Sequence, residues 1–255
     1  MRNARLIFLA LVFGVFWACG VSAQGEQDET SEANLSNPSN ESIPLSEPNE
    51  ENGPTEPSVS HESFILDDKM LLDGYSKKYA EEPKEFLLAM IKDDDLTPYM
   101  SAAALRIFRQ RFSQELVGSE KKITEKILLR RLNRTNSNFV EIEVMHILCV
   151  MDRYRYFGSF IPLMIELIDH QNSSIGELAF NSVNEILLNG PKRSREARIV
   201  FNTLRKNLFL SRQTYEDIDE PGPKLKQKLE LLRWAIKVLG TQELQRLPPK
   251  IIDFL

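Results

Sequence analysis

The sequence predicts an all-α fold, a short α-solenoid of stacked antiparallel helix pairs, and three observations lead to this prediction. Beyond Phe64, apolar residues recur at spacings of three and four, as on one face of a helix, and no segment alternates as a strand would. Glycine and proline divide this region into segments of roughly 12 to 18 residues, the usual length of globular helices. Asn-Ser followed by a helix-like run occurs at Asn136 and again at Asn172, which indicates a repeated unit.

The repeated region is expected to hold six helices in three antiparallel pairs. Pro98 suits the first position of one helix, with Thr97 as its cap. The expected caps of the other five helices are Ser119, Asn136 or Ser137, Ser159, Ser173 or Ser174, and Ser194. The apolar positions of 139–151 match those of 175–187, and the segment 139–151 is apolar nearly all round. We therefore expect it at the centre, with neighbouring helices on several sides.

The period and the apolar positions of about residues 84–210 resemble those of HEAT-like repeats, armadillo-type units that pair an A helix with a B helix. The chain looks like a bacterial-type exported HEAT-repeat protein. The resemblance implies a helical-repeat domain over 64–255, closed by a C-terminal cap at about 222–255. It also implies an interaction platform rather than an enzyme, although bilin lyases carry similar repeats.

The beginning of the chain predicts export. Two arginines precede an apolar run of 12 residues, 6–17, which is too short to span a bilayer. We expect residues 1–23 to be a signal peptide, cleaved after Ala23. The alternative is a lipoprotein that carries lipid on Cys19, although bulky aromatic residues precede this cysteine where lipoproteins have small ones. Both readings predict a protein of the periplasm, the cell envelope or the exterior.

Residues 24–63 form an acidic segment rich in Pro, Ser, Asn and Glu. It holds ten acidic residues and no Lys or Arg, whereas the region from Phe64 onward carries about +3. Such a segment has too little apolar surface to repay the entropy of ordering. We expect a disordered linker that keeps the helical domain away from an anchoring surface.

Signatures of catalysis are absent from the sequence, which holds no Gly-rich phosphate loop, nucleophile elbow or His-Glu-x-x-His motif. His146 is expected to be a satisfied core or groove histidine rather than a metal ligand. The three aspartates at 93–95 lack calcium-loop spacing and are expected to form a turn before the helix at Pro98. Cys149 is expected to be buried as a small hydrophobe. We predict no catalytic residue, cofactor or metal.

Two surface features are candidates for partner binding. In HEAT-type arrays the B helices line the concave face, and two of the expected B helices are rich in Lys and Arg. The segment "DRYRYF" at 152–157, expected as a turn, adds Tyr and Arg, which are frequent at interface hot spots. The candidate residues are Lys122, Lys126, Arg130, Arg131, Arg134, Tyr154, Arg155, Tyr156, Arg195 and Arg198. The alternatives are a solvated helical face and tyrosines that pack over the core.

These features together predict a non-enzymatic protein-protein interaction or scaffold module. The expected partner is another protein with an acidic surface, and a membrane tether would run through Cys19 only. A structural envelope spacer or assembly lipoprotein is the alternative, followed by a HEAT-like lyase-type enzyme. Nucleic-acid binding is disfavoured because the chain is expected to be exported and its net charge is −5.

Overall fold

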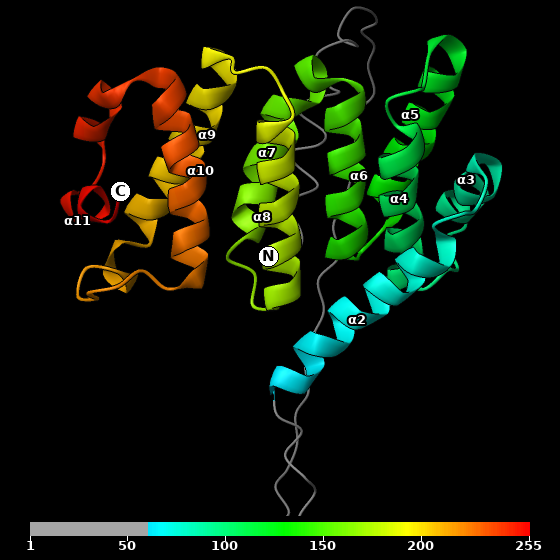
Figure 1. The fold of residues 1–255 in the computed structure, drawn as a ribbon, viewed down its shortest axis with the longest axis horizontal. Helices are drawn as coiled ribbons and strands as arrows, with labels where there is room; N and C mark the ends of the chain where they lie inside the picture. Colours follow the sequence, from blue (N-terminus) through cyan, green and yellow to red (C-terminus); the bar gives the residue numbers. More distant parts are fainter. Residues whose placement is uncertain (1–60) are drawn as a thin grey trace, which may run out of the picture. The chain divides into compact units, whose positions relative to one another are not determined.

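The computed structural model describes residues 61–255 and, from residue 68, their side chains. All regular secondary structure in this range is helical, which confirms the predicted all-α class (Figure 1). The α-helices are α2 (His61–Tyr79), α3 (Lys84–Lys92), α4 (Pro98–Phe112), α5 (Gly118–Arg134), α6 (Asn138–Met151), α7 (Arg153–Leu167), α8 (Ser173–Leu188), α9 (Ser194–Leu210), α10 (Pro223–Leu239) and α11 (Pro249–Phe254). The short 3-10 helices are η2 (Arg212–Thr214) and η3 (Thr241–Arg246). The predicted signal peptide, Cys19 and residues 24–60 of the predicted linker lie outside the described residues.

The helices from α3 to α10 pack in two layers. In one layer α4 lies beside α6, α6 beside α8, and α8 beside α10, whereas α3 packs on α5 and α7 packs on α9 in the other (Figure 1). Contacts between the layers join each of α5 and α7 to α6, and α9 to α10. The six helices that the sequence predicted between residues 98 and 210 are all present.

Helix α6 is the most enclosed of these helices, as the sequence predicted. It packs against α4, α5, α7 and α8. Its buried side chains lie on every side of the helix, and they include Val140, Val144 and Leu148, which are fully shielded. Cys149 is buried and free, as expected, and burial raises the pKa of its thiol to about 12. This thiol therefore behaves as a small apolar group.

Helix α2 lies along α4 and reaches the beginning of α8 (Figure 1). Asp68 accepts a hydrogen bond from the Tyr99 hydroxyl at the start of α4 and one of 2.6 Å from the Asn172 side chain before α8. One turn further, Asp73 pairs with Arg106 at 3.0 Å. These contacts fix α2 as a wall on the face formed by α4, α6 and α8.

Helix boundaries follow the expected capping chemistry at some positions and depart from it at others. Thr97 caps α4 as predicted and accepts from the Met100 amide at 3.4 Å. Ser119 does not cap α5, which starts at Gly118 with a φ of 57°, a conformation that glycine adopts at low cost. Asn172 caps α8, where its side chain accepts from the amide of Ser174.

The expected turn at 152–157 is in fact the start of α7. Asp152 caps this helix, because its side chain accepts from the Arg155 amide at 3.1 Å. Tyr156 and Phe157 are buried in the first turns, so packing favours a helix there. The predicted cap at Ser159 was therefore wrong, and Gly158, expected as a break, lies inside the helix.

The C-terminal segment forms α10, η3 and α11. Leu229 and Leu232 of α10 are buried, and the helix ends at Leu239, before Gly240 with its φ of 108°. None of the helices between residues 61 and 255 combines the length and apolar character needed to cross a bilayer.

Candidate functional site

The predicted partner-binding residues fall into two groups in the structure. The first lies on the N-terminal halves of α5, α7 and α9. Arg155 on α7 pairs with Glu125 on α5, and Arg195 on α9 stacks over the ring of Tyr154, 5.2 Å from its centroid. These contacts place α7 between α5 and α9 and join their exposed faces. We call Lys122, Lys126, Tyr154, Arg155 and Arg195 the α5–α7–α9 strip.

Side chains of this strip are well exposed. Tyr154 is 76% exposed, and Lys122 and Lys126 make no ion pair or hydrogen bond with any described residue. Ile123 on the same stretch of α5 is 59% exposed. The strip therefore combines free positive charge with accessible apolar and aromatic surface.

Tyr156 lies beside the strip but inside the protein. It is 6% exposed, and its hydroxyl donates to the Glu125 carboxylate that also pairs with Arg155. Burial, followed by the hydrogen bond to Glu125, raises the pKa of Tyr156. Of the two tyrosines, Tyr156 packs over the core and Tyr154 is presented to solvent.

The second group surrounds Asp94 at the C-terminal half of α5. Arg130, Arg131 and Arg134 all direct a guanidinium toward its carboxylate, at 3.4, 2.9 and 2.6 Å. The hydrogen bond from Arg134 is the main reason why the pKa of Asp94 lies below its ordinary value. One carboxylate of the turn before α4 thus offsets one of these three positive charges, and the group as a whole stays positive.

Arg131 has a structural position in this group. It is 6% exposed and donates to the Asp93 carbonyl at 3.0 Å and to the Ser101 hydroxyl at 2.7 Å, besides Asp94. It therefore ties α5 to the turn between α3 and α4. That turn was expected at 93–95, but its arginine partners were not.

Arg198, the last predicted residue, lies on α9 and turns toward the C-terminal segment. Its Nη1 is 3.4 Å from Glu243 Oε1 in η3. The structure thus joins Arg195 to Tyr154, and Arg155 to the helix that carries Lys122 and Lys126, but places Arg198 and the Asp94 group elsewhere.

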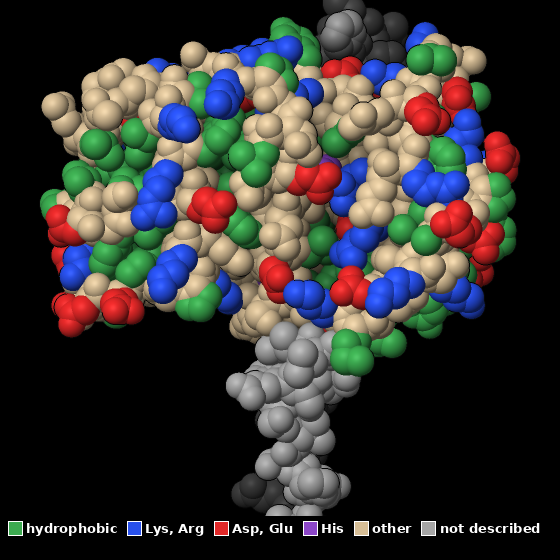
Figure 2. Space-filling model, in the orientation of Figure 1, with side chains coloured by type: hydrophobic (Ala, Val, Ile, Leu, Met, Phe, Trp, Pro, Cys, Tyr) green, Lys and Arg blue, Asp and Glu red, His purple; other side chains and the backbone are tan. Residues whose placement is uncertain are grey.

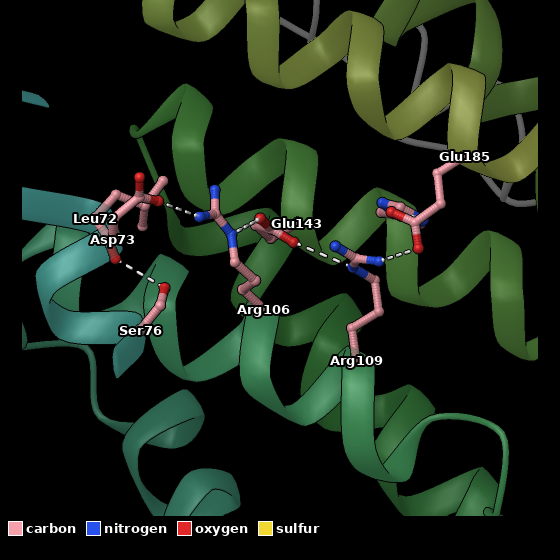
Figure 3. Close-up of polar contacts among 8 residues, drawn as sticks. Leu72, Asp73, Ser76, Arg106, Arg109, Glu143 and Glu185 are labelled. Carbon is pink, nitrogen blue, oxygen red and sulfur yellow. Dashed lines mark hydrogen bonds and ion pairs between the residues drawn. The ribbon is translucent and has the colours of Figure 1, made fainter. Parts of the chain in front are cut away.

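A second candidate site, which sequence reasoning missed, lies on the opposite layer. Glu143 of α6 is fully buried and accepts from Arg106 Nε at 3.0 Å and from Arg109 Nε at 3.4 Å (Figure 3). Arg106 also donates to Asp73 at 3.0 Å, and Arg109 to Glu185 at 2.6 Å. The four helices α2, α4, α6 and α8 each contribute charge to this network.

A groove of about 300 Å³ opens over the network, between α2 and α4 on one side and α8 on the other. On the face drawn in Figure 2, acidic and basic side chains intermingle over these helices. The charged residues that line the groove are Lys69, Asp73, Arg106, Arg109, Glu177 and Glu185. We call it the α2–α8 groove.

His146 lies beneath this groove. It is fully buried, as expected. The prediction that its ring would be hydrogen-bonded was wrong, because neither ring nitrogen has a partner among the described residues. Its Nε2 is 4.0 Å from Glu185 Oε2. Burial, and then the positive charge of Arg109, hold the pKa of His146 well below its ordinary value. The imidazole is therefore neutral at physiological pH.

Metal-ligand clusters of three or more His, Cys, Asp or Glu side chains do not occur among the described residues. No family model, curated protein or solved structure matches the chain. The α5–α7–α9 strip and the α2–α8 groove are therefore the features that bear on its function.

Proposed function

We propose that the protein is a non-enzymatic, exported scaffold that binds another protein through the α5–α7–α9 strip. The observation that carries this proposal is the alignment of exposed cations with an exposed aromatic ring across three helices. Tyr154 is 76% exposed, and Lys122 and Lys126 have no counterion among the described residues. Tyr and Arg are enriched at protein interfaces, and the two lysines suit a polar rim around them.

The partner proposed for the strip has an acidic surface with an apolar centre. Lys122 and Lys126 would steer such a partner electrostatically, while Tyr154 and Ile123 supply area to bury. Arg195 already stacks on the Tyr154 ring, which holds the ring in place and reduces the entropy lost on binding. The strip is thus partly preorganised.

The proposed architecture is a HEAT-like α-solenoid, and the two-layer packing supports it. Helices α4, α6 and α8 succeed one another in one layer while α7 and α9 adjoin in the second. A stack of this kind presents one face of each B helix side by side, which is how α5, α7 and α9 come to share a surface. We include export in the same proposal, with or without lipid on Cys19. The support for export is the apolar run near the start of the sequence.

Photocrosslinking in the native host tests this function. A photoreactive residue at Ile123 should capture a defined protein, and capture should fall at least about tenfold in the double variant Lys122→Glu and Lys126→Glu. Lys237→Glu on α10, also exposed and unpaired among the described residues, is the matched control and should leave capture unchanged. Tyr154→Ala should weaken capture without lowering the melting temperature.

The opposite result would be capture that survives all strip variants, or crosslinks to lipid and wall material alone. The first would remove the strip as the binding surface. The second would favour the spacer function over the scaffold.

A further inference from the structure

The α2–α8 groove has the features of a small-molecule site, and its charges are arranged in two levels. The guanidinium groups lie deep, since the side chains of Arg106 and Arg109 are 18% and 9% exposed. The carboxylates of Asp73, Glu177 and Glu185 lie at the rim, where the side chains are 46 to 50% exposed. A ligand would therefore meet acidic groups at the mouth and basic groups below.

Both deep arginines retain unused donors. Arg106 and Arg109 each commit Nε to Glu143 and Nη1 to a second carboxylate, and no hydrogen bond joins either Nη2 to a described residue. A guanidinium carries five N–H donors and matches the geometry of a carboxylate. Arg106 and Arg109 both line the groove, and their Nη2 groups are the donors left for an anionic group.

His146 is a second unusual feature of the network beneath the groove. Its imidazole is fully buried next to Glu185 and Arg109, yet both nitrogens are without a hydrogen bond among the described residues. Buried polar groups in native proteins are nearly always hydrogen-bonded. His146 does not line the groove, so its unpaired nitrogens are a property of the network below the groove and not a contact point for a ligand.

We propose that the α2–α8 groove binds a free α-amino acid. The ligand carboxylate would accept from the Nη2 groups of Arg106 and Arg109, and its ammonium would donate to the rim carboxylates of Glu177 and Glu185. The volume of about 300 Å³ is at the lower end for ligand pockets, which suits a molecule of this size. The rim carboxylates would repel a dianion, and the two arginines below them would repel a simple cation.

Helix α2 connects this site to the rest of the chain. It forms one wall of the groove through Lys69, Leu72 and Asp73, and Lys69 reaches across to Glu177 of α8 at 3.0 Å. An ammonium group bound at Glu177 competes with Lys69 for this carboxylate. Binding is therefore expected to alter the contact between α2 and α8.

Calorimetric titration of the purified full chain with each proteinogenic amino acid tests the proposal. At least one should bind, and its N-acetyl derivative and its amide should each bind at least about tenfold more weakly, because each lacks one charge. Glu177→Gln and Glu185→Gln should weaken the amino acid similarly. Asp219→Asn, an exposed carboxylate that does not line the groove, should have no effect.

Two results would overturn the proposal. One is the absence of heat and of any rise in melting temperature with every amino acid. The other is binding that the N-acetyl and amide derivatives share with equal strength, or that persists in both rim variants. Neither result depends on a protein partner, so the scaffold function and the amino-acid site can fail separately.

Discussion

Buried His146 should make the stability of the protein depend on pH, and His146→Leu should remove that dependence. Burial and Arg109 keep the imidazole neutral in the folded protein, whereas in the unfolded chain it takes up a proton near pH 6.5. The unfolded state therefore binds more protons as the pH falls, and the folded protein loses stability below that value. Above about pH 7.5 this contribution is fully present.

The magnitude follows from linkage. If the folded imidazole stays neutral to pH 5.5, one histidine of ordinary unfolded pKa destabilises the protein by about 1.4 kcal/mol between pH 7.5 and 5.5. For a domain of this size the loss corresponds to about 3–5 °C in melting temperature. Leucine cannot titrate, so the variant should lack this component while other groups still contribute.

Urea denaturation of both proteins at several pH values between 5.5 and 7.5 measures the effect. The groups that face His146 from neighbouring helices are Arg109 of α4 and Glu185 of α8. A second histidine variant, His170→Gln, should retain the loss of stability seen in the parent protein. Parallel pH profiles for the parent and His146→Leu would refute the reasoning, since they would mean that the folded imidazole also takes up the proton.

Three further predictions concern the stability of the fold, and two of them have a matched control substitution. Glu143→Gln leaves two arginines of the network without their shared buried anion and should cost about 3 kcal/mol in chemical denaturation, whereas Glu185→Gln, half exposed, should cost less than about 1 kcal/mol. Gly240→Ala should lower stability by about 1–2 kcal/mol because its φ is 108°, while Gly222→Ala, with a φ of −65° and open space around it, should stay within about 0.5 kcal/mol. Asp152→Ala should cost about 1 kcal/mol by removing the cap of α7, and equal stability would disprove that role.

The α5–α7–α9 strip could be predicted in part from the sequence. Lys122, Lys126 and Arg195 lie on predicted helices, and the turn-like segment before Gly158 drew attention to Tyr154 and Arg155. These residues lie near one another only because α7 packs between α5 and α9, and no local sequence pattern predicts that packing. For the same reason, the burial of some neighbouring candidate residues could not be predicted from the sequence.

Arg131 and Tyr156 illustrate that difference. Both belong to segments that read as polar and exposed, yet each is buried because a distant residue satisfies it. Arg131 finds Ser101 and Asp94, and Tyr156 finds Glu125. A charged or polar side chain can be buried at tolerable cost only when another element brings its partner, so its location depends on tertiary structure.

By itself the sequence determined the all-helical class, the six helices between residues 98 and 210, and the start of one of them after Thr97, because periodicity and capping act over a few residues. Only the tertiary structure decided that α7 starts at Arg153 and that α2, α4, α6 and α8 enclose a charged groove. Glu143 and Arg106 are 37 positions apart, and Asp68 and Asn172 are 104 apart. An amphipathic pattern states which side of a helix is buried but not what it packs against, and packing creates these sites.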